Sequence, residues 1–378
     1  MAKKTITIPA ASDTSAHVRN ARWDGWLSAL TGFGMTDKDK TQSTSFKSDV
    51  VSYDIAMDLW RGDDIAARII ETIPKEELRQ GFELTIADDK DYKEELMSWS
   101  EELGLLGAMQ EARCYERAYG GAAIMMGALD GSTDLTLPLN LARVRDIKWL
   151  TVLEPREMMP VAWYNDPDGD GPNYGMPSVY QFQPIGRGVS AEGKQPPFKL
   201  LRIHESRLLL FPGIRVSRRR WVTGAMPGWG DSVLTRCIRV LRDFNVSWGS
   251  AGILVHDFAQ AVFKIKGLAE LIALDKDEVV KNRLRAVELS RSTARAVLID
   301  AEEEFERKQT PVSGLPELLD RFSTRLAAAA DMPLTLLMGQ SPAGLNATGE
   351  SDIRFFYDRV KSSQRERVLP PLRRFFQV

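Results

Sequence analysis

The sequence is poor in the residues that most often carry out chemistry. It has three histidines, His17, His204 and His256, and two cysteines, Cys114 and Cys237, in 378 residues. No pair of these has the spacing of a zinc site, and no serine or cysteine stands in a known nucleophile motif. No Gly-rich stretch matches a dinucleotide-binding or Walker pattern. We therefore expect a non-enzymatic protein with no catalytic residues, cofactor or metal.

Other absences bear on location and partners. The sequence has no run of 18 apolar residues and no N-terminal apolar stretch of signal-peptide length. The two cysteines lie far apart in apolar helical patterns, which is typical of buried thiols in a reducing compartment. Fifty Lys and Arg residues oppose 52 Asp and Glu, a net charge of −2, so the basic excess of a dedicated DNA-binding protein is missing. We expect synthesis in the cytoplasm and no membrane contact.

What is present indicates a folded chain with more than one core. The hydrophobic fraction is 43% and the charged fraction 27%, and a single core rarely serves a chain this long. Residues 1–45 are polar and predict a loosely held arm. Helical spacing begins at Ser52, is interrupted at Arg61-Gly62-Asp63 and is punctuated by Pro74, which predicts two short helices. Residues 81–84 ("GFEL") then predict a strand.

Further along, the pattern alternates between helical and strand regions. A helix is expected over 91–106 and another up to Tyr119, followed by a buried strand over 122–126. Residues 147–215 predict a β-rich region. From Val233 to Trp248 an apolar stripe predicts a long helix that ends at Gly249, and residues 257–306 predict strands "AVFKIK" and "RAVLID" around a helix.

The last third of the chain predicts two more helices. One carries Leu318, Leu319, Phe322 and Leu326, and the other starts near Ser351 and must kink or end at Pro370-Pro371. The fold class that these elements indicate is α+β.

One acidic turn could hold a cation. Asp166, Asp168 and Asp170, followed by Gly171, reproduce positions 1, 3, 5 and 6 of a calcium-binding loop, but Pro177 stands where its bidentate Glu belongs. A solvated Asp-Gly turn is the simpler interpretation. The alternative is a metal-dependent phosphodiesterase or nuclease that uses these aspartates with a histidine such as His204.

Two basic runs allow two interpretations. The first places Arg215, Arg218, Arg219 and Arg220 beside Trp221, and the second carries seven Lys and Arg residues against two acids between Arg354 and Arg374. Each run could contact phosphate. A solvated face, or a subunit contact paired with the acids of "DAEEEFE" at 300–306, explains them equally well.

Four segments in order carry a resemblance to a known family. They are "MDLWRGDDIAARIIETIPKEELRQGFEL" at 57–84, "IHESRLLLFPG" at 203–213, "GWGDSVLTRCIRVLRDF" at 228–244, and the stretch 323–375 that contains "DMPLTLLMG", a Gly/Asn loop and "VLPPL". Together the chain resembles the portal proteins of tailed bacteriophages, in the branch long known as a domain of unknown function.

That resemblance implies a ring, usually of twelve copies, at one capsid vertex, through which DNA is packaged and ejected. It divides the chain after the arm into the parts of the portal fold: a wing at 46–228, a first stem helix at 229–256, a clip at 257–306, a second stem helix at 307–332, a tunnel loop at 333–352 and a C-terminal wing helix at 353–378. Relatives usually continue into a crown. This chain stops at "RRFFQV", so we expect the crown to be absent or truncated and Phe375 and Phe376 to be exposed.

The tunnel loop is expected to touch DNA weakly. Its stretch "MGQSPAGLNATGESD" at 338–352 offers the neutral groups of Gln340, Ser341, Asn346 and Thr348 and no fixed positive charge. Many phosphate ion pairs would arrest a sliding duplex, whereas uncharged groups release it. A surface turn in a monomeric protein is the alternative, but loops of this length are usually functional or disordered.

The resemblance also implies partners and location. These are further copies of the chain, the terminase large subunit, the major capsid protein or scaffold, a head–tail adaptor and transient non-specific double-stranded DNA. The chain would assemble in the bacterial host cytoplasm and reside in the virion. A monomeric capsid adaptor or scaffold component is the third possibility, which a mass measurement separates from a ring.

Overall fold

The computed structural model describes residues 51–85, 90–166, 168–169, 171–183, 201–218, 221, 226–256, 259–264, 304–309, 314–339 and 348–378. Within these, the side chains of 90, 255–256, 259–264, 304–309 and 348–351 are not described. The predicted arm at 1–45 lies outside the described residues, and residues 51–378 form one compact unit.

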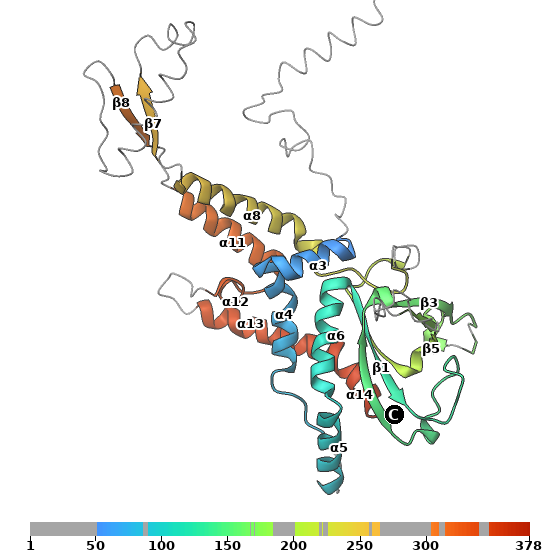
Figure 1. Ribbon diagram of the computed structural model, residues 1–378. Coiled ribbons are helices and arrows are strands. Elements are labelled where there is room, and N and C mark those ends of the chain that lie inside the picture. Colours follow the sequence, from blue (N-terminus) through green and yellow to red (C-terminus); the bar gives the residue numbers. More distant parts are fainter. Residues whose placement is uncertain are drawn as a thin grey trace, which may run out of the picture. The chain divides into compact units, whose positions relative to one another are not determined.

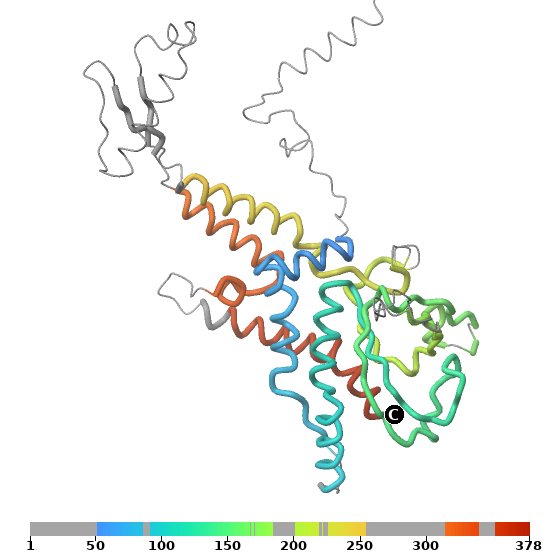
Figure 2. Tube along the Cα trace, in the orientation of Figure 1, coloured from blue at the N-terminus to red at the C-terminus, as the bar shows by residue number. Residues whose placement is uncertain are grey.

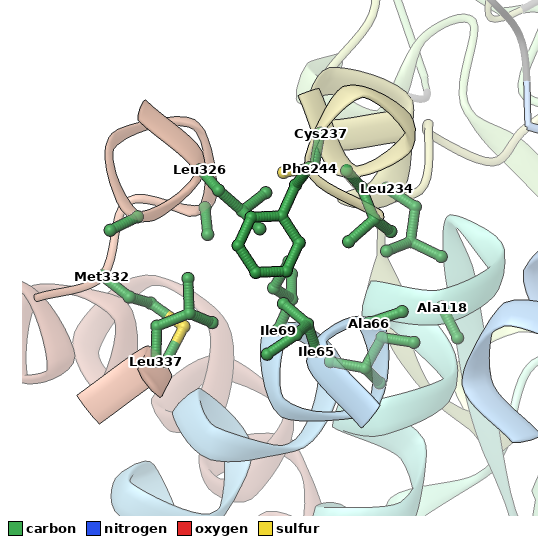
Figure 3. Close-up of a cluster of buried hydrophobic side chains, with 14 of the residues drawn as sticks. Ile65, Ala66, Ile69, Ala118, Leu234, Cys237, Phe244, Leu326, Met332 and Leu337 are labelled. Atoms are coloured by element: carbon green, nitrogen blue, oxygen red, sulfur yellow. The ribbon is translucent and has the colours of Figure 1, made fainter. Parts of the chain in front are cut away.

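Helices from distant parts of the sequence enclose one apolar core. They are α3 (Tyr53–Gly62), α4 (Asp64–Leu78), α6 (Leu105–Tyr119), α8 (Leu234–His256), α11 (Leu315–Ala330), α12 (Leu334–Met338) and α13 (Thr348–Ser363). Figure 3 shows Phe244 of α8 pointing between Leu326 of α11 and Ile65 and Ile69 of α4. Burial of these side chains is the main force that holds the helices together.

The predicted break between the first two helices is confirmed. Gly62 ends α3, and Asp63 begins the next helix because its carboxylate accepts a hydrogen bond of 2.7 Å from the backbone N–H of Ala66. The Ser52 hydroxyl caps α3 in the same way. Pro74 lies inside α4 and does not end it.

A three-stranded antiparallel sheet forms the centre of the part of the unit that lies outside this helical core. Strand β1 (Gly121–Ala128) lies between β2 (Ile147–Leu153) and β6 (Leu208–Pro212). Side chains alternate between its faces: Ala122 and Ile124 pack towards α6 and α14 (Leu369–Phe375), whereas Ala123 packs towards a second sheet. Because both faces are covered, the strand is apolar throughout, and the predicted buried strand at 122–126 is confirmed.

The second sheet covers the other face. It has the order β3 (Met158–Trp163), β4 (Pro177–Phe182) and β5 (Leu201–His204), all antiparallel. The expected β-rich region at 147–215 is therefore confirmed over its described parts. Trp229 fills the space between the sheets, and its indole N–H donates a hydrogen bond of 2.9 Å to the carbonyl of Met158.

Helices α8 and α11 lie side by side and run in opposite directions (Figures 1 and 2). The Sγ of Cys237, early in α8, lies 3.2 Å from the carbonyl of Ala329, late in α11. The prediction that Gly249 ends this helix was wrong, since α8 continues to His256. Gly249 has no positive φ that would turn the chain out of the helix, and contact with α11 outweighs the modest cost of an interior glycine.

A two-stranded sheet lies between these two helices in the sequence. Strand β7 (Ala259–Lys264) pairs with β8 (Glu304–Gln309) in antiparallel register. The strand predicted at "RAVLID" and the helix before it lie outside the described residues. Strand β8 reaches three residues past the predicted boundary at 306.

Three further expectations concern residues 81–84 and the C-terminal helix. Residues 81–84 form no strand, because no neighbouring strand pairs with them; α5 (Lys90–Glu102) follows. The last helix does not end at Pro370 and Pro371, but its regular turns are interrupted by a π-helical turn at Gln364–Val368 directly before α14 begins, so the predicted irregularity lies just ahead of the prolines. Phe375 is 1% exposed and stacks on Trp99 at 5.2 Å, so the expected exposed terminus was wrong.

The described helices also bear on the membrane prediction. None of them combines the length and apolar character that crossing a bilayer needs.

Candidate DNA-channel segment and its anchors

The predicted tunnel loop is shorter than its expected bounds. Helix α12 forms within its first part and α13 begins at Thr348 instead of 353, so the segment that joins the two helices is 339–347. Gln340, Ser341 and Asn346 lie outside the described residues. Thr348 is the first residue of α13, and its side chain is not described. The structure therefore defines how this segment is held at each end.

The first anchor is the end of α12. Gly339 adopts a left-handed conformation with φ of 69°, and its N–H donates a hydrogen bond to the carbonyl of Thr335. Leu337 is fully buried in the helical core, and its carbonyl accepts a hydrogen bond of 3.0 Å from the guanidinium of Arg68 on α4. The chain thus leaves the core at a fixed point and in a fixed direction.

The second anchor ties α13 to the turn after α11. Among the described residues, Asp331 is the one non-glycine residue with a positive φ, 58°, and it caps α11. Its carboxylate forms an ion pair with Arg359 of α13. Phe356 and Val360 of the same helix are buried in the core that also holds Leu337. The helices on either side of the segment 339–347 are therefore packed on one core.

Several basic residues of the C-terminal run have partners inside the chain. Arg374 forms an ion pair of 2.8 Å with Glu205. Arg367 donates hydrogen bonds to the carbonyls of Pro212, at 2.5 Å, and Gly213, at 3.1 Å. These two and Arg359 are therefore paired within the chain, which neither of the two interpretations predicted. Of the other basic run, Arg219 and Arg220 lie outside the described residues.

A buried ionic network beneath the π-helical turn escaped the sequence analysis. Arg113 of α6 forms a two-contact ion pair with Glu77 of α4 and a further pair with Glu116. Glu116 also lies 3.3 Å from Arg367. Gln364 of the π turn donates a hydrogen bond of 2.6 Å to the carbonyl of Glu77. The network joins α4, α6 and the C-terminal helix.

A neighbouring arginine completes this region. Arg117 donates hydrogen bonds to the carbonyls of Ile69 and Ile70. Burial, together with the charge of Arg113, lowers the pKa of Arg117 to about 10. The sequence signal that pointed here was Pro370-Pro371, which predicted an irregular helix but not the charges beneath it.

The alternative metal site is not assembled among the described residues. Asp166 and Asp168 are exposed, and the carboxylate of Asp166 accepts a hydrogen bond of 3.0 Å from the backbone N–H of Asp168, as in an Asp turn. Asp170 lies outside the described residues. The described part of the chain contains no group of three His, Cys, Asp or Glu residues placed to hold a metal ion.

His204 serves the fold of its own turn. Its Nδ1 accepts a hydrogen bond of 3.2 Å from the backbone N–H of Ser206 and lies 2.9 Å from the hydroxyl of the same residue. Its Nε2 lies 3.4 Å from the hydroxyl of Tyr164. Burial lowers the pKa of His204. These contacts cap the turn that leads into β6.

Comparison with known proteins finds related chains. The sequence is 31% identical over 370 residues to "Anti-CBASS protein Acb1" of a Caulobacter species, covering 94% of this chain and 56% of that protein. It is 28% identical over 315 residues to an uncharacterized protein of Haemophilus influenzae, covering 83% of this chain and 67% of that one. The chain thus spans little more than half the length of the first relative.

Among solved structures, the neck of an empty gene transfer agent particle contains a similar chain. It has 14% sequence identity and a TM-score of 0.48, covering 89% of this chain and 82% of that one. A phage portal protein of the HK97 family from Corynebacterium diphtheriae has 10% identity and a TM-score of 0.35, covering 80% of this chain and 83% of the other.

The family match settles the resemblance that four sequence segments suggested. The sequence model of the family described as "Phage portal protein" matches residues 56–378, which is nearly the whole unit that the structure describes. The α+β fold agrees with that assignment. The chain belongs to the phage portal protein family.

Proposed function

We propose that the chain assembles into a closed ring at one capsid vertex, dodecameric as in most portals, whose channel passes double-stranded DNA during packaging and ejection. The observation that carries this proposal is the family match over residues 56–378. In this proposal the ring docks the terminase large subunit and a head–tail adaptor and contacts the capsid protein or scaffold. It assembles in the host cytoplasm and becomes part of the virion.

Within the ring, we assign the parts of the portal fold to described elements. The antiparallel pair α8 and α11 supplies the two stem helices, and the β7–β8 sheet belongs to the clip. The two sheets with α3 to α6 supply the wing, which α13 and α14 complete. The segment 339–347 supplies the tunnel loop.

Two features support the assignment of the loop. Its residues 340–347 include no Lys, Arg, Asp or Glu, and the helices that flank it bury Leu337 and Phe356 in the same core. A neutral loop on rigid anchors can lie against a passing duplex without the salt-sensitive affinity that phosphate ion pairs would create. This chain covers 56% of the length of each of the two relatives named "Anti-CBASS protein Acb1". That name is therefore not extended to this chain.

The loop assignment is tested by adding charge. The double change Gln340→Arg and Asn346→Arg places two cations per copy in the loop, and we expect tighter DNA retention with a steeper dependence on salt, because each phosphate contact adds to the slope. Binding of a short linear duplex to assembled rings is measured from low to physiological salt.

A control places a single cation elsewhere. Ser98→Arg adds an exposed cation on α5, away from the proposed loop in the sequence. If the loop variant and the control change DNA retention equally, the loop does not line the channel.

A further inference from the structure

A cleft of about 500 Å³ is lined by side chains of α4, α6, α8 and α13 and of the π-helical turn that follows α13. Its volume lies within the range of roughly 300–1,000 Å³ that is usual for small-molecule sites. Arginine side chains from four of these elements line it, and we call it the arginine cleft. They are Arg113, Arg117, Arg236, Arg359 and Arg367.

The chain neutralises three of these arginines itself. Arg113, Arg359 and Arg367 each lie beside a carboxylate of the chain. The other two form no ion pair in the described part of the chain. Arg117 donates hydrogen bonds of 3.0 and 2.6 Å to two backbone carbonyls, which carry no net charge, and Arg236 is exposed. Two guanidinium charges of the cleft are therefore left without a carboxylate.

Repulsion between the guanidinium groups is a second sign of excess positive charge. Burial and then the charge of Arg113 lower the pKa of Arg117 to about 10. Burial also lowers the pKa of Arg367, and the charges of Arg113 and Arg215 add to that effect. An anion between these groups would relieve the repulsion, because opposite charges attract strongly where water is partly excluded.

The acidic residues of the lining leave room for such an anion. Glu116 and Asp331 are engaged in ion pairs with arginines of the cleft. Glu366 is exposed and forms no ion pair in the part of the chain that the structure describes. Its carboxylate is therefore the group of the lining that would compete with an incoming anion.

We propose that the arginine cleft binds a phosphate group between Arg117 of α6, Arg236 of α8 and Arg367 of the π-helical turn. The oxygens of a phosphate point in several directions, so guanidinium groups from three elements can donate to it together. The two oxygens of a carboxylate lie in one plane and suit a single guanidinium, as Glu77 does with Arg113. The site lies within one copy of the chain, so it does not depend on the proposed ring.

Orthophosphate is the probe for this site. The full chain is titrated by calorimetry at constant ionic strength, with chloride as the balancing salt, so that general screening does not change. We expect saturable binding of one phosphate per copy. The melting temperature should rise with phosphate concentration, because a ligand that binds the folded state stabilises it.

Arg236→Gln removes one of the two unpaired cations. Because Arg236 is exposed, the variant should keep its circular dichroism spectrum and its melting temperature in chloride. Its affinity for orthophosphate should fall at least about tenfold, the loss expected of a hydrogen bond to a charged group. Arg236→Lys keeps the charge but not the planar fork, so its affinity should lie between those of the wild type and Arg236→Gln.

Glu366→Gln should change the affinity in the opposite direction. It removes the competing carboxylate, and we expect binding to tighten by about threefold, as for other exposed charges. Two controls make the same changes of charge elsewhere. Arg242→Gln on α8 and Asp352→Asn on α13, both at exposed positions, should bind orthophosphate like the wild type.

Competition shows which molecule supplies the phosphate. Displacement of orthophosphate by adenosine monophosphate would identify a free phosphate ester as the ligand, whereas displacement by a short DNA duplex alone would identify the DNA backbone. Either result supports the site. Acetate that binds as tightly as orthophosphate would show a carboxylate site and overturn the inference.

Three further results would overturn it. They are an absence of saturable phosphate binding, wild-type affinity in Arg236→Gln, and equal weakening by Arg242→Gln, which would show a diffuse positive field instead of a site. A chain that binds phosphate but stays monomeric would contradict the proposed function and leave this inference standing.

Discussion

Arg113 and Glu77 join α6 to α4 through two contacts of 2.8 Å, with side chains 2% and 0% exposed. Removing one partner from such a pair leaves a buried charge uncompensated. We expect Arg113→Ala to lower the free energy of unfolding by about 3–5 kcal/mol, measured by chemical denaturation.

An exposed pair on α4 provides the control for that variant. Lys75 and Glu71 lie 2.6 Å apart at the surface, and Lys75→Ala should cost at most about 0.5 kcal/mol. Equal losses for the two variants would show that the buried network does not stabilise the fold.

Asp130 should make the fold sensitive to acid. Burial alone raises the pKa of Asp130, but hydrogen bonds from Arg207, Ser132 and Asn140 outweigh it and lower the pKa to about 2. Since the pKa of an unfolded Asp is about 3.9, this contribution to stability is complete above pH 4 and is lost as the pH falls towards 2.

The measurement compares unfolding across that window. The free energy of unfolding of the wild type should fall between pH 4 and pH 2 more steeply than that of Asp130→Asn, which has no carboxylate to protonate. Asp91→Asn, at an exposed position, should keep the wild-type slope. Parallel slopes for wild type and Asp130→Asn would contradict the prediction.

Gly120 lies where the end of α6, the start of β1 and the segment before α8 meet. Its φ is 85°, and a Cβ placed on it would lie 2.5 Å from the carbonyl oxygen of Gly230. Gly120→Ala should therefore cost more than the roughly 1–2 kcal/mol that left-handed backbone alone costs. Gly104→Ala, with φ of 65° and no atom within 4 Å, should show the backbone cost by itself.

Phe375 should be a main stabilising residue of the C-terminal segment. It is 1% exposed between Trp99 and Phe376, and Phe375→Ala should cost about 3–5 kcal/mol of unfolding free energy. Phe355→Ala, at a position 67% exposed, is the matched control and should cost under about 0.5 kcal/mol in the unassembled chain. A small loss of unfolding free energy in Phe375→Ala would show that the C-terminal segment is loosely packed.

Local chemistry explains what the sequence could predict. Gly62 and the capping side chain of Asp63 marked a helix boundary that the structure confirms, and the apolar run after Gly121 predicted a strand covered on both faces. These signals lie within a few residues of the feature they predict. The portal family itself was recognisable from four segments in order.

Long-range contacts explain what the sequence could not predict. Gly249 looked like a helix end, but contact with α11, more than 60 residues later in the sequence, keeps α8 helical. Phe375 was expected to be exposed, because its contact with Trp99 joins residues that are far apart in the sequence. No sequence pattern predicted that Arg113 pairs with Glu77 and Glu116, because Glu77 is 36 residues from Arg113. Of the proposed loop, the structure describes the anchors.

The mass of the purified chain in solution tests the account most directly. By native mass spectrometry or light scattering, a ring of identical copies has a mass that is one fixed multiple of 42.4 kDa, and images of the same sample show a central hole. A particle of 42.4 kDa at every concentration, with no ring in the images, would contradict the proposal that this chain forms a channel for DNA.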